Sequence, residues 1–472
     1  MLNLTKLALY STLISLAAAS NPSFAVVYKW RGVNGLINYT STPPSNGVRY
    51  RVVKGSIKKP PTPAPIPTPS PTPLPTPQPA PSPTPQPAPT PAPTTFAAPI
   101  VITKGGTYSG NWESKDGTVA AVKVQTSEPV IIENCKIRAA GEGVSAYSTD
   151  ANLTVRNCTG EALNPNVLGK QKQGFVAAGV FKTLTVENNE ETGFATGVRA
   201  LNYGTDVTRT GQKLIVRFNK FRNVDGRESD GAGGYSKDAI GKGGSAISLN
   251  TLRSAQVEIA WNEIINTPYN SRPEDIISTY ESSGTSANPI HIHDNYIQGG
   301  YAADPAARVN YSGCGIQIGD APNKDDVGYS NVHDNQIINT ENCGIGISAG
   351  HHQQVHHNRI VSAKTTSTGV VLGGNYRNGL GLWDYYADTG QICKPTGNPF
   401  WHDNSMHDNV VNVANFAGTA ASDYYCSLDA GANVTQLNNV NNMGHIATNA
   451  DEQAEYTRWK DKLIVQKIKV GM

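Results

Sequence analysis

One short segment recurs through most of this chain, and it restricts the possible folds more than any other feature. Its pattern is apolar-x-apolar-x-x-Asn-x-apolar, as in residues 214–221 and 257–264. A second strand-like pattern, as in residues 245–249, alternates with it, and the shortest interval between copies is 23 residues. Short strands in coils of this size, with longer loops in some coils, predict a right-handed parallel β-helix of roughly ten coils over residues 100–450.

The expected β-helix follows from burial. One such coil cannot enclose its own apolar side chains, so it must stack on its neighbours at about 4.8 Å per coil. We expect the recurrent Asn at a bend, where its amide can bond the Asn of the next coil. An open sandwich or a propeller is the alternative, but either would require a more even period and hairpin turns.

Four of the six cysteines fit the same register, in positions that match between successive coils, and the other two remain for two late loops. Stacked neighbours are close enough for a disulfide, whereas no Cys-x-x-Cys or other zinc spacing is present in the sequence. We therefore expect structural disulfides, the last of them between two late loops. The three expected pairs are Cys135 with Cys158, Cys314 with Cys343, and Cys393 with Cys426.

The first 99 residues have a different composition from the rest. Residues 1–25 have the features of a secretory signal peptide, with Lys6 before an apolar stretch and a small-x-small cleavage site at residues 23–25. Residues 26–58 are expected to form a small β-hairpin module with a tight turn at residues 34–35. In residues 59–99 Pro dominates, which predicts a stiff polyproline II linker, with a docking site for Pro-binding domains as the alternative.

Charge is also uneven along the chain. The first 99 residues hold eight basic and no acidic residues, which leaves 31 basic and 37 acidic residues for the remainder. A nucleic-acid-binding body would need a basic face, so we expect no nucleic-acid partner. The basic N-terminal module could contact the anionic cell envelope or acidic glycans, or it could serve solubility alone. At the other end, residues 451–472 have helical spacing and are expected to cap the last coil.

The N-terminal module resembles a short bacterial envelope domain of unknown function. The resemblance rests on the Tyr-Lys-Trp of residues 28–30 and the Thr-Pro-Pro of residues 42–44. It implies a Gram-negative protein that is secreted, periplasmic or displayed at the cell surface. It implies no chemistry.

The repeat of residues 100–450 resembles the pectate-lyase-like superfamily, whose enzymes act on acidic polysaccharides in a groove beside one parallel sheet. The resemblance implies the fold and a polysaccharide ligand, but no particular activity. Polar and aromatic residues collect at the ends of the second strand pattern, beside the longest insertions, and sugar faces stack on such rings. The expected substrate-binding residues are Asn250, Glu281, Arg308, His351, Trp383, Asp384 and Tyr385.

Residues 274–280 are similar to a segment of the alginate lyase and chondroitinase B group, in which an acidic residue helps to hold calcium and a lysine removes the proton beside the uronic carboxylate. Asp275 matches the acidic position, but Tyr280 stands where the lysine is expected and Pro273 replaces a second carboxylate. The resemblance implies a weak calcium site at Asp275. We expect no other cofactor.

A β-elimination needs a base and a group that neutralises the uronic carboxylate. Tyr280 could be the base if Lys242 or Arg308 lowers its pKa, and Arg199 could bind the carboxylate bidentately. The plain alternative is that Tyr280 lines the groove and Asp275 bonds turn amides. A glycoside hydrolase would instead need paired carboxyl groups. The candidates for that pair are Asp275, Glu281, Asp320 and Asp384.

All ten histidines follow residue 290, and several occupy the place two before the recurrent Asn. They should stack in a column that faces solvent, with metal binding as the alternative. Taken together, the sequence predicts a secreted carbohydrate-active protein. The first hypothesis is a polysaccharide lyase acting on a uronate-containing glycan. A non-catalytic glycan-binding or display protein and a hydrolase with paired carboxylates are the alternatives.

Overall fold

The chain forms two compact units, Met1–Pro89 and Thr90–Met472. The signal peptide expected at residues 1–25, Lys242 and Cys426 lie outside the described residues. The computed structural model describes residues 27–31, 37–40, 50–53, 94–147, 149–203, 209–236, 243–253, 256–308, 313–320, 326–374, 377–385, 393, 398–419, 424–425, 435–439 and 443–472.

The first unit contains a small antiparallel sheet. Its strands are β1 (Val27–Arg31), β2 (Ile37–Thr40) and β3 (Tyr50–Val53), in the order β2-β1-β3. The expected hairpin is therefore present as β1 and β2, which pair from Arg31 with Ile37 onward, and a third strand pairs with the other edge of β1.

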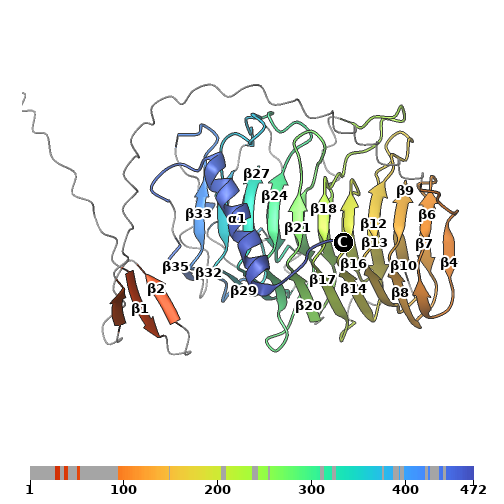
Figure 1. Cartoon of the computed structure of the whole chain (residues 1–472), viewed down its shortest axis with the longest axis horizontal. Helices are drawn as coiled ribbons and strands as arrows, with labels where there is room; N and C mark the ends of the chain where they lie inside the picture. Colours follow the sequence, from red (N-terminus) through yellow and green to blue (C-terminus); the bar gives the residue numbers. More distant parts are fainter. Residues whose placement is uncertain are drawn as a thin grey trace, which may run out of the picture. The chain divides into compact units, whose positions relative to one another are not determined.

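The second unit is a right-handed parallel β-helix built from three long sheets, which confirms the predicted fold (Figure 1). Sheet 1 consists of β4 (Ile100–Ile102), β7 (Val122–Val124), β10 (Val144–Tyr147), β13 (Gly174–Gly179), β16 (Thr196–Leu201), β19 (Ser245–Asn250), β22 (Asp275–Tyr280), β25 (Cys314–Ile318), β28 (Cys343–Ile347), β31 (Asn378–Leu382) and β34 (Tyr424–Tyr425).

Sheet 2 consists of β5 (Gly106–Tyr108), β8 (Pro129–Glu133), β11 (Asn152–Arg156), β14 (Thr183–Glu187), β17 (Lys213–Arg217), β20 (Gln256–Ala260), β23 (Ile290–His293), β26 (Gly328–His333), β29 (His351–His356), β32 (Ser405–His407) and β35 (Thr435–Leu437). Sheet 3 consists of β6 (Asn111–Ser114), β9 (Lys136–Ala139), β12 (Thr159–Ala162), β15 (Glu190–Thr192), β18 (Lys220–Arg222), β21 (Glu263–Ile265), β24 (Tyr296–Gly300), β27 (Gln336–Thr340), β30 (Arg359–Ser362) and β33 (Val410–Val413).

Each coil passes through sheets 1, 2 and 3 in turn, so every strand pairs with the strand three places along in the chain. The corner between sheets 2 and 3 is only two residues long. Its first residue has a left-handed backbone, as at Asp294 (φ 54°) and Asp334 (φ 56°), and its second is the recurrent Asn. Asn and Asp tolerate this conformation better than other residues, which explains their frequency there.

The apolar side chains of the three sheets point inward and stack in columns. In sheet 2, for example, Val155, Val186, Val216 and Ile259 are in register on successive strands, and all are fully buried. This column explains the sequence repeat, because each coil buries its apolar residues against the residues at the equivalent positions of the neighbouring coils.

One helix, α1 (Asn449–Gln466), begins with a capping box between Thr448 and Asp451. It lies along the outer face of sheet 3 (Figure 1). There Trp459 packs on Tyr296, and its indole N–H donates to the Asp294 carbonyl at 2.7 Å. The expectation that this helix caps the last coil is therefore wrong, because its apolar residues pack against the outer face of sheet 3. Among the described residues, no helix has enough length and apolar character to cross a membrane.

Candidate functional site

The outer face of sheet 1 carries a row of polar side chains in register across successive strands. The row is defined by backbone pairing, so each member lies about 4.8 Å from the next strand's member. Toward the last coils it contains two glycines, Gly346 and Gly381, and the register continues from Gly381 to Tyr425 of β34. The other members are Lys123, Ser145, Ala177, Arg199, Ser248, Ser278 and Gln317.

Asp275 lies beside this row, at the start of β22, and is paired with Cys314 of the next strand. Its side chain is half-buried. Burial, with the neighbouring carboxylates of Glu274 and Asp320, raises the pKa of Asp275 to about 8. A carboxyl group with this pKa keeps its proton at neutral pH and can act as a general acid.

A second set of polar groups lies at the far end of β22. Tyr280 is in register with Asn250 of β19. The Thr251 hydroxyl lies 2.6 Å from Asn250 Oδ1 and 3.0 Å from Glu281 Oε2, and the Glu281 N–H donates to the Asp320 carbonyl at 2.6 Å. Burial, Glu274 and Glu281 raise the pKa of Asp320 as well.

These contacts bring four of the expected site residues together on neighbouring strands: Asn250, Tyr280, Glu281 and Asp320. Asp275 lies at the other end of β22, and the charge of Asp320 contributes to its raised pKa. Arg199 is on the same face, two strands before β22, and its guanidinium donates to Thr196 Oγ1 at 3.3 Å. The cluster has more carboxyl groups than the sequence argument assigned to it, because Glu274 takes part.

Aromatic rings lie close over two glycines of this face, Gly179 on β13 and Gly381 on β31. A Cβ atom on Gly179 would lie 2.7 Å from the ring of Tyr147 and 2.8 Å from the ring of Tyr203. On β31 the indole of Trp383 lies over Gly381, where a Cβ atom would overlap it. The absence of side chains at these positions therefore gives the rings their place on the sheet.

A cavity of about 690 Å³ opens on the first coils of the same face. Its lining includes Lys123, Ser145, Glu142 and Tyr147, whose hydroxyl donates to Glu142 Oε1 at 2.5 Å. Burial raises the pKa of Tyr147, and Arg199 opposes that shift. Sequence reasoning missed Lys123 and Tyr147, because only the strand register shows that they share a face with Arg199.

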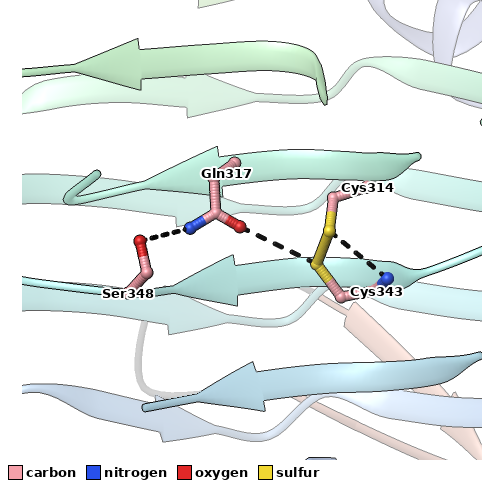
Figure 2. The surroundings of a disulfide bond; sticks show 4 residues. All are labelled: Cys314, Gln317, Cys343 and Ser348. Carbon is pink, nitrogen blue, oxygen red and sulfur yellow. Dashed lines mark hydrogen bonds between the residues drawn. A yellow bond between two sulfur atoms is a disulfide. The ribbon is translucent and has the colours of Figure 1, made fainter. Parts of the chain in front are cut away.

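The predicted disulfide between Cys314 and Cys343 is present on this face, between β25 and β28 (Figure 2). Gln317 lies beside it and donates to Ser348 Oγ at 2.7 Å (Figure 2). Cys393 is also disulfide-bonded, whereas its expected partner, Cys426, lies outside the described residues.

The expected disulfide between Cys135 and Cys158 is wrong for this structure, in which both are free and buried thiols. The Cys135 thiol lies 3.1 Å from the Glu133 carbonyl, and the Cys158 thiol lies 3.2 Å from the Arg156 carbonyl. A hydrogen bond between the two thiols lowers the pKa of Cys135 and raises that of Cys158. Each thiol thus bonds the corner carbonyls as the Asn amide does in later coils.

Several expected binding residues lie elsewhere. The guanidinium of Arg308 lies 4.0 Å from the ring centre of Phe416, a residue of the last coils. Asp384 is fully buried and accepts from Asn398 Nδ2 at 3.1 Å, which places it inside a loop instead of on the open face. Tyr385 is 63% exposed, and its N–H donates to the Ser348 carbonyl.

His351 is buried, at the corner between sheets 1 and 2, so its expected role of direct sugar contact is also not supported by its position. The predicted histidine column is present on sheet 2. Its rings stack with centroids 5.0 to 5.1 Å apart and with interplanar angles of 2° to 11°. The members are His293, His333, His356 and His407.

Among the described residues, three metal-ligating side chains converge within 4.8 Å only at His352, His402 and Asp403. Asp275 is not in that group, so calcium at Asp275 stays a prediction. Comparisons with protein-family models, curated proteins and solved structures found no match. The site therefore has to be interpreted from its own geometry.

Proposed function

We propose that this protein binds an extended acidic glycan on the outer face of sheet 1 and cleaves it with paired carboxyl groups, as a glycoside hydrolase does. The observation that carries the proposal is the position of Asp275. This carboxyl group keeps its proton at neutral pH, and it lies next to a row of polar side chains that is long enough for a polymer.

The binding part of the proposal rests on the aromatic and basic side chains of this face. Sugar rings present C–H faces that stack on aromatic side chains, and the rings of Tyr147, Tyr203 and Trp383 lie close over glycines of this sheet. Lys123 and Arg199 add positive charge near the ring of Tyr147, which suits the carboxylates of uronic acids. An acidic glycan is thus favoured over a neutral one.

The chemical part rests on Asp275 and Asp320. In such a reaction the Asp275 carboxyl donates its proton to the glycosidic oxygen, so that the leaving sugar departs as an alcohol. The Asp320 carboxylate then accepts a proton from the attacking water or adds to the anomeric carbon. The charge of Asp320 adds to the upward shift of the Asp275 pKa, which favours Asp275 as the acid of the pair.

Elimination at the same face is the second candidate. It is favoured by the register that places Tyr280 and Arg199 on one face, two strands apart, with Tyr280 as base and Arg199 on the uronic carboxylate. Of the two cations expected to assist Tyr280, Arg308 lies against Phe416 and Lys242 lies outside the described residues. The carboxyl pair therefore has more support than the tyrosine.

The test is an activity screen of the full chain on acidic and neutral polysaccharides, with reducing ends and ultraviolet absorbance read together. New reducing ends without absorbance, abolished in Asp275→Asn, are the expected result. Absorbance from an unsaturated uronide, lost in Tyr280→Phe, would replace hydrolysis by elimination. Binding without products would leave a glycan-binding protein. Glu258→Gln, on the outer face of sheet 2, is the matched control.

A further inference from the structure

The corner between sheets 1 and 2 also brings together a second set of reactive side chains, on the coils of β29 and β32. His351 begins β29, and it pairs in register with His402 of the next coil. The residue after each has a left-handed backbone, with φ 52° at His352 and 55° at Asp403. This conformation turns the second side chain of each pair across the stack.

The ring orientations at this corner differ from those in the histidine column, where all neighbouring rings are stacked. His351 and His402 are stacked, with centroids 5.0 Å apart and planes 4° apart. The His352 ring stands at 87° to His351 and 85° to His402. Its Nε2 lies 3.8 Å from Asp403 Oδ2, and one ligand atom from each of His352, His402 and Asp403 falls within 4.8 Å of the others.

These separations suit one metal ion. Zinc lies about 2.1 Å from imidazole nitrogen and from carboxylate oxygen, so one ion can bridge ligand atoms up to about 4.2 Å apart without movement. The 3.8 Å between His352 Nε2 and Asp403 Oδ2 is within that limit. The three ligand atoms all lie within 4.8 Å of one another, so a small side-chain adjustment would bring them to one ion. Asp403 Oδ2 also lies 2.7 Å from His402 Nδ1, a contact that holds the two side chains together. In the described residues this is the one group of three ligating side chains that converges.

A hydrogen-bond relay prepares His352 as a ligand. His351 Nε2 lies 2.7 Å from Asp326 Oδ1, and His351 Nδ1 lies 2.7 Å from His352 Nδ1. A carboxylate only accepts, so neutral His351 carries its proton on Nε2, and His352 donates from Nδ1. The lone pair of His352 Nε2 then faces Asp403. Metal-binding histidines are commonly oriented by such a carboxylate behind them.

The site is accessible to solvent on its outer side. The side chains of His352, His402 and Asp403 are 39%, 33% and 36% exposed. The ring of Tyr329 stacks on His352 with centroids 4.7 Å apart, which fixes the imidazole in place. Three protein ligands with an open side leave coordination positions for water or an anionic group.

The chain contains a near copy of this arrangement, five residues further along each segment. His356, His357, His407 and Asp408 repeat the two pairs, and His356 Nδ1 lies 2.8 Å from His357 Nδ1. In both groups the Asp carboxylate lies close to Nδ1 of the preceding His, at 2.7 Å for His402 and Asp403 and at 2.8 Å for His407 and Asp408. In the copy, however, Asp408 also bonds the side chain of Asn438.

Two further differences separate the copy from the first group. The rings of His357 and His407 are 6.2 Å apart, against 5.5 Å for His352 and His402. The residue behind His356 is the neutral amide of Asn331, at 2.8 Å, where Asp326 stands behind His351. The copy is therefore a natural control for the first group.

We propose that His352, His402 and Asp403 form a binding site for one divalent transition-metal ion of the zinc type, with Asp326 and His351 as positioning residues. The site is independent of the proposed glycan cleavage, and its test needs no glycan.

The experiment is a calorimetric titration of Zn²⁺ into the metal-stripped full chain. We expect one tight ion per chain. His352→Ala and Asp403→Asn should each weaken binding at least tenfold, and Asp326→Asn should weaken it about tenfold through the relay. His357→Ala, in the near copy, should bind as the wild type does.

Three results would overturn the proposal: no Zn²⁺ binding by the wild type, unchanged binding in both His352→Ala and Asp403→Asn, or an equal loss in His357→Ala. Circular dichroism establishes that each variant is folded. If His352→Ala does not fold, the near-isosteric Asp403→Asn still decides the matter. The visible absorption of bound Co²⁺ gives a second readout, which should change in Asp403→Asn and not in His357→Ala.

Discussion

The side chain of Asn262 donates to Asn295 Oδ1 at 2.9 Å, and the backbone N–H of Asn262 donates to the same oxygen at 3.0 Å. One amide oxygen thus binds two donors of the preceding coil. The same pair of contacts recurs between Asn219 and Asn262. These fully buried amides join the coils at the corner where the chain passes from sheet 2 to sheet 3.

Asn262→Ala is expected to destabilise the β-helix by about 3 kcal/mol. The variant would leave the Asn219 N–H and the Val216 carbonyl buried without their partner, at about 1–3 kcal/mol for each. Urea denaturation measures the loss. Asn270→Ala, in an exposed turn, is the control and should change stability by less than about 0.5 kcal/mol. Equal effects of the two variants would contradict a structural role for the ladder.

We expect His356 to make the stability of the folded protein depend on pH. Burial and the charges of His333, His407 and His357 lower its pKa to about 4, while Asp334 opposes the shift. Between pH 6.5 and 4 the unfolded chain binds more protons than the folded one, so stability falls as pH is lowered through this window.

Since His356 is partly exposed, its contribution to this loss is about 1–2 kcal/mol. Thermal unfolding of the wild type and His356→Gln from pH 7.5 to 4 measures the contribution of His356 together with its coupling to the neighbouring histidines, because the variant lacks this titration. Parallel stability–pH curves for the two proteins would show that the pKa of His356 is not lowered in the folded state.

Asp275 contributes with the opposite sign. Its pKa is about 8 in the folded protein, so the folded state binds more protons than the unfolded state, and stability falls as pH rises from about 4 to 8. Asp275→Asn removes this term. We expect the variant to be more stable than the wild type at pH 8, by about 2 kcal/mol, and nearly equal at pH 4. A less stable variant at pH 8 would mean that the carboxyl group has a structural role.

Lys172 and Asp225 form a buried ion pair, 2.7 Å apart, and Arg227 also binds Asp225 at 2.7 Å. Asp225→Asn would leave two cations without their carboxylate, which costs about 3–5 kcal/mol when the charges are buried. A lower thermal midpoint checks this. Lys115→Ala, which removes an 82% exposed member of a surface pair, should have almost no effect.

The cysteines can be counted chemically. Alkylation of the denatured, unreduced protein should modify two cysteines, Cys135 and Cys158, which mass spectrometry can locate. The same treatment of the native protein should modify neither, because both thiols are buried. Absence of alkylation after denaturation would mean that the two thiols pair, as their positions in the sequence suggested.

The sequence determines the fold because its repeat and the fold have the same cause. Residues that stack in a column, such as Val186 and Val216, occupy the same apolar position in successive copies of the repeat. The stacked asparagines, such as Asn189 and Asn219, likewise occupy one repeat position. The Cys314–Cys343 disulfide was predictable for the same reason, since stacked positions are identical positions of the repeat.

The tertiary structure decided what the repeat does not encode. The position of Arg308 against Phe416 depends on two loops that are more than 100 residues apart. The long helix lies along sheet 3 because Trp459 fits against Tyr296, a contact across 163 residues. Within the repeat, His352 and His357 look alike in the sequence, yet only His352 faces a carboxylate at 3.8 Å. Local pattern fixes which residues stack, whereas ring orientation at a left-handed corner depends on every side chain packed around it.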